Sequence, residues 1–234
     1  MISIFFTRPF RLCAIGILLV LISGCSALRP AATTQPAFYA LDNARSENRS
    51  AGGTPALLLV EAPTLIVNPP HAASGFDSQR IIYVREAHKL EYYAHSEWVD
   101  TPARMLAPLI VASVGNTGAF RAVVQKPSAA DGDLRLDTEI VRLQHDIGMI
   151  PGRVRFTLRA YIVDDTTRQI IATREFDETT IAASEDPIGG VVAANRAVQA
   201  VLDHLASFCA ETATLWLPVT GKIPKRSEGG ATGY

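Results

Sequence analysis

The sequence predicts a single domain of the α/β (α+β) class, in which a mixed, largely antiparallel sheet carries two main helices. A period-two alternation of apolar and polar residues between residues 134 and 181 is typical of long antiparallel strands with one buried face. Residues 102–114 and 187–212 instead repeat apolar side chains at spacings of three and four, as amphipathic helices do. The predicted domain, residues 55–217, is long enough to bury a sizeable core.

An export signal precedes this domain. Two basic residues, Arg8 and Arg11, lead into an apolar run that ends at Ile22. The run is shorter than the roughly 20 residues that a membrane-spanning helix needs, which indicates a cleaved signal at residues 1–24. Residues 22–25, Ile-Ser-Gly-Cys, resemble the lipobox of bacterial lipoproteins and predict lipid attachment at Cys25. Several acyl chains such as palmitate would hold the mature protein at a membrane. The alternative is a plain signal peptide or a short uncleaved anchor.

Residues 25–54 are rich in Ala, Thr, Ser, Pro, Asn and Gly, and predict a flexible tether after the lipidated N-terminus. Within it, residues 38–41, Phe-Tyr-Ala-Leu, predict a short edge strand that docks onto the domain. At the other end of the chain, residues 218–234 are polar and rich in glycine, and predict a disordered tail.

The first half of the domain alternates short strands with turns. The apolar run at residues 56–60 predicts a central strand, and residues 64–78, with Asn-Pro-Pro in their middle, predict a loop. Residues 80–84 and 89–94 predict two paired strands joined by a polar turn. Pro102 follows a polar cap and predicts the start of a helix, in which Pro108 is expected to cause a kink or an early end. Residues 120–124 predict a short strand whose exposed edge permits self-association.

The second half predicts a three-stranded meander followed by a long helix. Residues 134–140, 154–162 and 169–181 alternate apolar side chains with Arg, Asp and Glu, which predicts cross-strand ion pairs on the solvent face. Asp186 and Pro187 predict the start of the closing helix. Its predicted buried face comprises Ile188, Val191, Val192, Asn195, Val198, Val201, Leu202, Leu205 and Phe208.

The sequence predicts no enzymatic activity, no cofactor and no metal site. The five histidines lack metal-ligand spacing, and no nucleophile motif or phosphate-binding glycine loop is found. His145 and Asp146 could form a base-and-orienter pair, but neighbours on a strand point to opposite faces, which favours ordinary polar surface residues. The formal net charge of −1 argues against a nucleic-acid partner.

The cysteines predict a mature chain without an intramolecular disulfide. Of three cysteines, Cys13 leaves with the signal and Cys25 carries lipid, so only Cys209 remains. Its place in a helical apolar pattern predicts burial, and intermolecular pairing is the alternative.

Aromatic residues and arginines gather between residues 80 and 98, and predict a partner surface. Its candidate residues are Arg80, Tyr83, Tyr93 and Trp98, because exposed Tyr, Trp and Arg are typical binding anchors. The alternative is that they pack the strand pair onto the neighbouring helix. Tyr92 and Tyr93 are adjacent, so one of them is expected to face away from the core.

The order of these features resembles the ABC-type transport auxiliary lipoproteins, which include the PqiC-like outer-membrane lipoproteins. The resemblance rests on the lipid-attachment motif, residues 38–41, 80–83 and 90–93, Trp98, Pro102 and the Ala/Val-rich closing helix. It implies an accessory of an ABC lipid transporter, docking onto an MCE-domain protein or handing over lipid. Ser26 after the acylated cysteine fits the periplasmic face of the outer membrane. The alternative is an envelope structural or assembly lipoprotein that binds another periplasmic protein without contacting lipid cargo.

Overall fold

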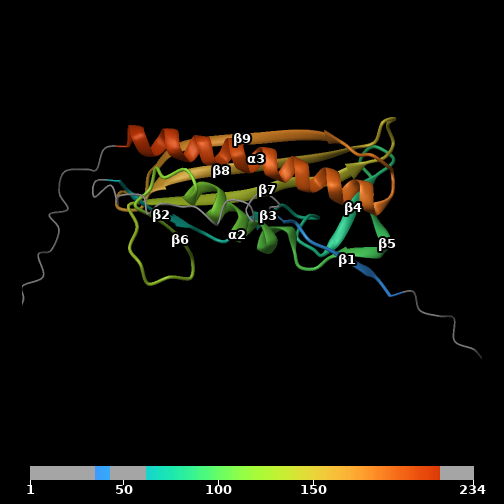
Figure 1. The fold of residues 1–234 in the computed structure, drawn as a ribbon, viewed down its shortest axis with the longest axis horizontal. Helices are drawn as coiled ribbons and strands as arrows, with labels where there is room; N and C mark the ends of the chain where they lie inside the picture. Colours follow the sequence, from blue (N-terminus) through green and yellow to red (C-terminus); the bar gives the residue numbers. More distant parts are fainter. Residues whose placement is uncertain (1–34, 43–61, 217–234) are drawn as a thin grey trace, which may run out of the picture. The chain divides into compact units, whose positions relative to one another are not determined.

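The computed structural model describes residues 35–42 and 62–216. The signal, Cys25, most of the tether, the strand expected at residues 56–60 and the tail at 218–234 lie outside the described residues. The described strands and helices, in chain order, are β1 (Ala37–Tyr39), β2 (Thr64–Val67), β3 (His71–Ala72), β4 (Arg80–Val84), β5 (Glu91–Trp98), α2 (Pro102–Gly115), β6 (Ala122–Gln125), β7 (Leu134–Asp146), β8 (Arg153–Asp164), β9 (Ile170–Ile181) and α3 (Pro187–Leu215) (Figure 1).

The sheet is organised around β7, and it confirms the predicted mixed α+β fold. The short strands β2, β3 and β4 pair in parallel with successive parts of β7 along one of its edges. Along the other edge, β8 pairs with β7 antiparallel and β9 pairs with β8, as the meander prediction expected. β6 pairs with β2 and ends the strand order on its side of the sheet, so the predicted edge position is confirmed.

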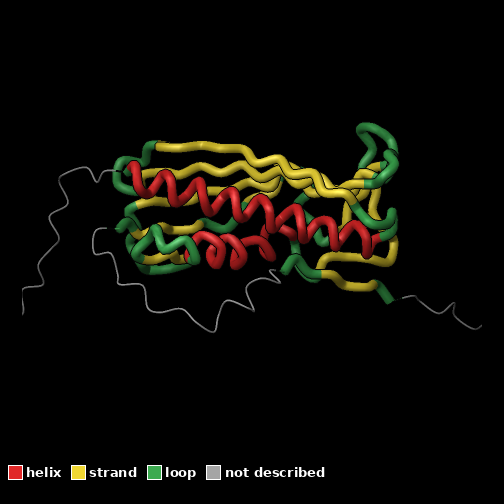
Figure 2. The backbone as a smooth tube through the Cα atoms, turned by 45° about the horizontal axis from the view of Figure 1, so that its top comes forward, coloured by secondary structure: helices red, strands yellow, loops and turns green. Residues whose placement is uncertain are grey.

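Both helices lie on the same face of the sheet (Figure 2). α3 packs along β8 and β9, and α2 packs beside α3. Between the layers lie large apolar side chains with almost no exposed surface, including Phe156, Leu158, Leu202 and Leu205. Burial of each such side chain stabilises the fold by about 1.5–3 kcal/mol, which makes this layer the main source of stability.

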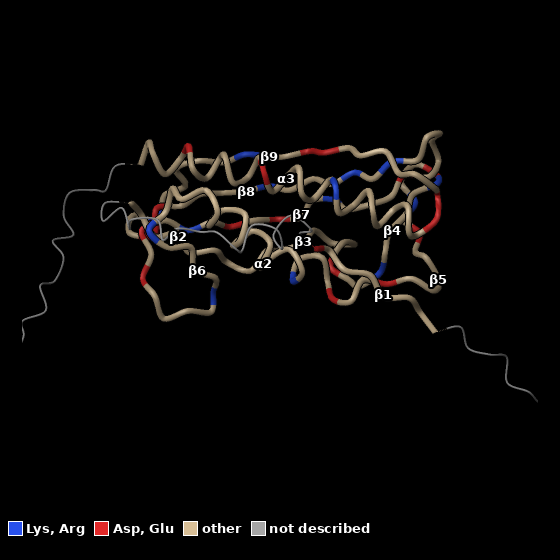
Figure 3. Tube along the Cα trace, in the orientation of Figure 1, with Lys and Arg blue, Asp and Glu red and all other residues tan. Residues whose placement is uncertain are grey.

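The face of the sheet away from the helices carries charges of both signs. Figure 3 shows basic and acidic residues interspersed along β7, β8 and β9. Arg159 of β8 lies 3.1 Å from Glu139 of β7 and 2.8 Å from Glu175 of β9. Arg155 of β8 lies 3.9 Å from Asp177 of β9. The predicted cross-strand ion pairing is therefore confirmed.

Local sequence signals determine where the helices begin. The Asp186 carboxylate accepts a hydrogen bond of 2.8 Å from the Gly189 N–H at the start of α3, as expected for an N-cap. Hydrogen bonds from Gly189 and Ser184 hold the pKa of Asp186 below its usual value.

In α2, the exposed Pro108 neither ends nor shortens the helix, which continues to Gly115.

Two predictions about local structure are wrong. Residues 64–78 were expected to form a loop, but β2 and β3 lie there, and all four residues of β2 are buried. The run Leu65-Ile66-Val67 forms a strand because it is apolar and two of its three residues are β-branched, and the following prolines mark only its end. On α3, Ile188 and Val192 were expected to be buried but are 59% and 44% exposed. Glycine and alanine residues of α3 are buried in place of Ile188 and Val192.

The segment at residues 38–41 docks onto the domain, as predicted. β1 pairs in parallel with β5, and Leu41 is buried. The side-chain amide of Asn195 on α3 forms hydrogen bonds with the backbone on both sides of Leu41. It accepts a hydrogen bond from the Asp42 N–H at 2.8 Å and donates one to the Ala40 carbonyl at 3.1 Å. The segment from β1 to Asp42 is therefore part of the folded domain.

Candidate functional site

The β4–β5 hairpin carries two aromatic–arginine groups on opposite faces. The Arg80 guanidinium lies 4.8 Å from the centre of the Tyr92 ring. The rings of Tyr83 and Tyr93 lie 4.7 Å apart, and the Arg85 guanidinium lies 5.6 Å from the Tyr83 ring. Adjacent residues of a strand point to opposite faces, so the Tyr92 group and the Tyr93 group are separated by the sheet. Tyr92 is the more exposed of the two tyrosines, as the sequence required of one of them.

The predicted partner residues are therefore not all brought together. Tyr83 and Tyr93 stack on each other, Arg80 lies on the opposite face, and Trp98 is only 3% exposed and belongs to the core. The Trp98 backbone closes the hairpin through a hydrogen bond from its N–H to the Gln79 carbonyl. We define the Tyr83–Tyr93 surface as Tyr83, Arg85 and Tyr93. Two rings and a guanidinium in contact are the residue types that anchor protein partners.

His145 lies directly beneath this surface. Its Nδ1 is 3.0 Å from the Tyr93 hydroxyl, which donates its proton to the Glu185 carbonyl at the same distance. Because the hydroxyl has only one proton to donate, its oxygen accepts from Nδ1–H of His145. The neutral imidazole thus carries its proton on Nδ1. The relay from His145 through Tyr93 to Glu185 links β7, β5 and the turn before α3.

The burial of His145 contradicts the expectation of an ordinary surface residue. Its side chain is 2% exposed, and Nε2 has no hydrogen-bond partner among the described residues. The reason is an irregularity in β7 between Ile140 and Arg142, where the register with β8 shifts. An extra residue at such a bulge reverses which side chains face inward. Beyond it Leu143 and His145 point to the core, and Asp146 points away.

Helix α3 approaches His145 closely because two residues of its first turn, Gly189 and Gly190, lack side chains. A Cβ atom built on Gly190 would lie 2.6 Å from His145 Nδ1, which is closer than real contacts allow. A Cβ atom on Gly189 would lie 2.5 Å from the Ser184 carbonyl oxygen. The Gly189-Gly190 pair after the helix cap is thus the sequence signal for this close approach, because glycine costs stability inside a helix unless contact requires it.

The electrostatics of the site favour a structural role for the relay. Burial raises the pKa of the Tyr93 hydroxyl to about 12, and Tyr83, Asp186 and Glu185 add to the effect. Burial also lowers the pKa of His145, against smaller opposing effects of Asp146 and the other acidic groups. Both groups are therefore neutral near pH 7. A tyrosine held this far from its ionised form is a poor proton donor or nucleophile, but a stable hydrogen-bonding link.

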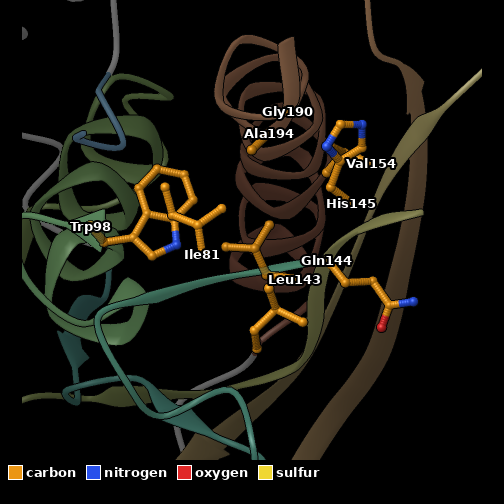
Figure 4. A pocket seen from close by; sticks show the side chains of 9 residues that line it. Ile81, Trp98, Leu143, Gln144, His145, Val154, Gly190 and Ala194 are labelled. Atoms are coloured by element: carbon orange, nitrogen blue, oxygen red, sulfur yellow. The ribbon is translucent and has the colours of Figure 1, made fainter. Parts of the chain in front are cut away.

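A small cavity lies between the hairpin, β7 and α3. Figure 4 shows Trp98 and Ile81 on one side of it, Gly190 and Ala194 on the α3 side, and Gln144 pointing away. Its volume is about 10 Å³, about the space that one water molecule needs. Pockets for drug-sized ligands are roughly 300–1,000 Å³. This cavity cannot enclose a lipid acyl chain.

Residues 35–42 and 62–216 contain neither a metal-binding cluster nor a membrane-spanning helix. In that part of the chain, no group of three or more His, Cys, Asp or Glu side chains could hold a metal ion. No helix there combines the length and the apolar character that crossing a bilayer requires.

Solved structures define the class of fold. A crystal structure of a protein from Xanthomonas campestris matches with a TM-score of 0.60 and 23% identity, covering 65% of this chain and 87% of that one. A second, uncharacterised protein matches with a TM-score of 0.55 and 12% identity, covering 76% and 98%. The PelC dodecamer from Paraburkholderia phytofirmans matches at a TM-score of only 0.38 and 13% identity, covering 61% and 86%. No curated protein matches the chain.

Sequence comparison identifies the family. The family described as ABC-type transport auxiliary lipoprotein component matches residues 39–206. The chain belongs to this family, as the order of its aromatic and helical segments predicted. The match begins within β1 and includes the whole hairpin and the relay beneath it. The domain is therefore an auxiliary component of ABC-type transport.

Proposed function

We propose that this lipoprotein is a lipid-anchored, non-enzymatic accessory of an ABC lipid transport system that contains an MCE-domain protein. The mature N-terminus at Cys25 would carry the lipid, and Ser26 beside it favours the periplasmic face of the outer membrane. The family assignment supports a transport accessory. A short tether between lipid and domain would raise the local concentration of the domain near a partner at the same membrane.

The observation that carries the docking role is the Tyr83–Tyr93 surface. Two tyrosine rings in contact and an arginine over one of them give a rigid, partly exposed anchor, because the relay through His145 fixes Tyr93 from below. A fixed side chain loses little conformational entropy when a partner binds, so more of the contact energy remains as affinity. The small cavity beside the relay supports docking rather than the carrying of cargo inside that cavity.

Photo-crosslinking in the native envelope tests this role. A photoreactive amino acid replaces Tyr83, and a matched control replaces Ile170, which is 60% exposed at the start of β9. The start of β9 is at the opposite end of the meander from Tyr83. We expect the probe at residue 83 to capture an MCE-domain protein and the probe at residue 170 not to capture it. Capture of the MCE-domain protein at neither position would overturn the docking proposal.

An envelope assembly role is the second candidate, and the same experiment separates it from the first. The exposed edge strand β6 and the surface tyrosines suit any periplasmic protein partner, not only a transporter. Capture of a structural envelope protein at residue 83, with no transporter subunit, would favour assembly.

A further inference from the structure

Large apolar side chains are exposed together at one end of the sheet. We define the apolar end as Met149, Ile150, Ile181 and Ile188, which are 51%, 94%, 63% and 59% exposed. Met149 and Ile150 form the β7–β8 turn, Ile181 ends β9 and Ile188 lies in the first turn of α3. The Ala182 N–H donates to the Gly152 carbonyl at 2.9 Å, which joins the two turns. Figure 1 shows this end on the right, where α3 begins.

Exposed apolar side chains of this size at adjoining turns call for an explanation, because they contribute nothing to the core. A soluble domain usually leaves turn positions to polar or small residues. Clustered exposed apolar residues mark contact with a protein or with a membrane. Ile150 is the most exposed of the four and lies in the turn of the β7–β8 hairpin, which suits insertion into a soft surface better than packing on a flat one.

The N-terminal end of β1 points towards this end of the sheet. β1 runs parallel to β5, with Ala37 opposite Ser96, and β5 starts at Glu91 beside the end of β4. β4 ends next to the end of β7, just before the turn that carries Ile150. Pro36, which precedes β1, therefore faces the apolar end. Ten residues lie between Pro36 and Cys25 in the sequence, and a chain of this length spans at most roughly 40 Å.

Charges near the apolar end show what kind of surface it fits. Arg85, Lys89 and Arg153 lie there, but so do acidic residues, among them Glu86 and Glu185. These residues of mixed charge do not form a polybasic patch, which would attract anionic headgroups. Attraction to a membrane must therefore come from the apolar side chains.

We infer that the apolar end contacts the lipid surface to which Cys25 is attached, with Ile150 inserted at the level of the acyl chains. The inference rests on the proposed lipid anchor. The anchor keeps the end within reach of the bilayer, and the four side chains then orient the domain with its β7–β8 turn against the membrane. In this orientation the opposite end of the meander, at Asp164 and Ile170, points away from the membrane into the periplasm.

The test uses full-length lipidated protein in vesicles of phosphatidylethanolamine and phosphatidylglycerol. An environment-sensitive NBD label is placed on a cysteine at residue 150 (Ile150→Cys) or, as the control, at residue 170 (Ile170→Cys). Cys209 does not interfere, because its side chain is fully buried. We expect spin-labelled lipid to quench the label at residue 150 and to leave the label at residue 170 bright. Equal quenching at both positions, or none at residue 150, would overturn the inference.

Two variants separate this inference from the anchor itself. With the label moved to Met149→Cys, Ile150→Asp should reduce the membrane-inserted population about tenfold or more, since burial of an isoleucine is worth more than the 1.4 kcal/mol that corresponds to tenfold. The Ile150→Asp protein should still float with the vesicles, and quenching should be the same at low and high salt. Quenching that Ile150→Asp leaves unchanged refutes the membrane contact alone. Flotation of Cys25→Ala at the wild-type level refutes the anchor instead.

Discussion

The Tyr93→Phe substitution tests the relay that fixes the Tyr83–Tyr93 surface. It removes one oxygen atom and keeps the ring, so the stacking on Tyr83 at 4.7 Å is preserved. Two hydrogen bonds are lost, one from His145 Nδ1 and one to the Glu185 carbonyl. The two losses are unequal because the Glu185 side of the relay is exposed and His145 is buried.

The magnitude follows from that difference in exposure. Water can replace the lost partner of the Glu185 carbonyl at little cost. It cannot readily reach Nδ1–H of His145, whose side chain is 2% exposed. A buried donor left without a partner costs about 1–3 kcal/mol, so Tyr93→Phe should lower the free energy of unfolding by that amount. For a domain of this size, each kcal/mol corresponds to a decrease in Tm of about 2–4 °C.

Urea denaturation measures the effect, with Tyr92→Phe as the matched control on the opposite face of β5. The control should change the free energy of unfolding by less than about 0.5 kcal/mol, as is usual for exposed positions. The double variant Tyr93→Phe/His145→Gln should cost less than the sum of the single variants, because the two side chains share one hydrogen bond. Additive costs, or a stable Tyr93→Phe variant, would show that the relay does not hold the surface.

Four further results are expected. Burial lowers the pKa of His145 below the usual 6.5, so this histidine takes up a proton in the unfolded chain before it does in the folded one as the pH falls. The free energy of unfolding should therefore decrease below about pH 6.5, by up to about 1.4 kcal/mol per pH unit. Urea titrations at several pH values measure this decrease, and His145→Gln should remove the contribution of His145. Burial raises the pKa of the Cys209 thiol to about 12, so Ellman's reagent should react with it only after unfolding. Gly190→Ala should destabilise the fold by about 1–3 kcal/mol through overpacking in thermal unfolding, whereas Gly115→Ala, with open space around it, should not. Arg159→Ala should lower the urea midpoint less than Tyr93→Phe does, because its ion pairs are partly exposed, and an equal or larger decrease would contradict this ranking.

Periodicity predicted the parts of the fold in which a strand or helix keeps one face inward. Strand β7 as far as Ile140, strand β8 and helix α2 are of this kind, because their apolar positions recur at regular spacing. β2 escaped prediction because its short apolar run precedes two prolines, and a strand with parallel neighbours on both sides has no alternation to detect. The buried face of α3 was misplaced at Ile188 and Val192 because the contact there is made by glycine and alanine.

The site was harder to predict than the fold because it depends on one irregularity. Strict alternation from Leu134 would place Gln144 and Asp146 inward, and the bulge after Ile140 places His145 there instead. No pattern in the local sequence predicts that shift in register. The hairpin itself was predicted, but the sequence does not show which of its candidate partner residues share a face in the folded structure. Trp98 went to the core, Arg80 to one face and Tyr83 with Tyr93 to the other.

The most direct test of the account is purification of the intact lipoprotein from native membranes in mild detergent, followed by identification of the proteins that accompany it. The wild type should retain an MCE-domain protein together with an ABC permease or ATPase, and Tyr83→Ala should lose them while remaining lipidated and folded. Retention of the same transporter subunits by Tyr83→Ala, or recovery of the wild type with no transporter subunit, would contradict the proposal that this surface docks the protein onto a lipid transport system.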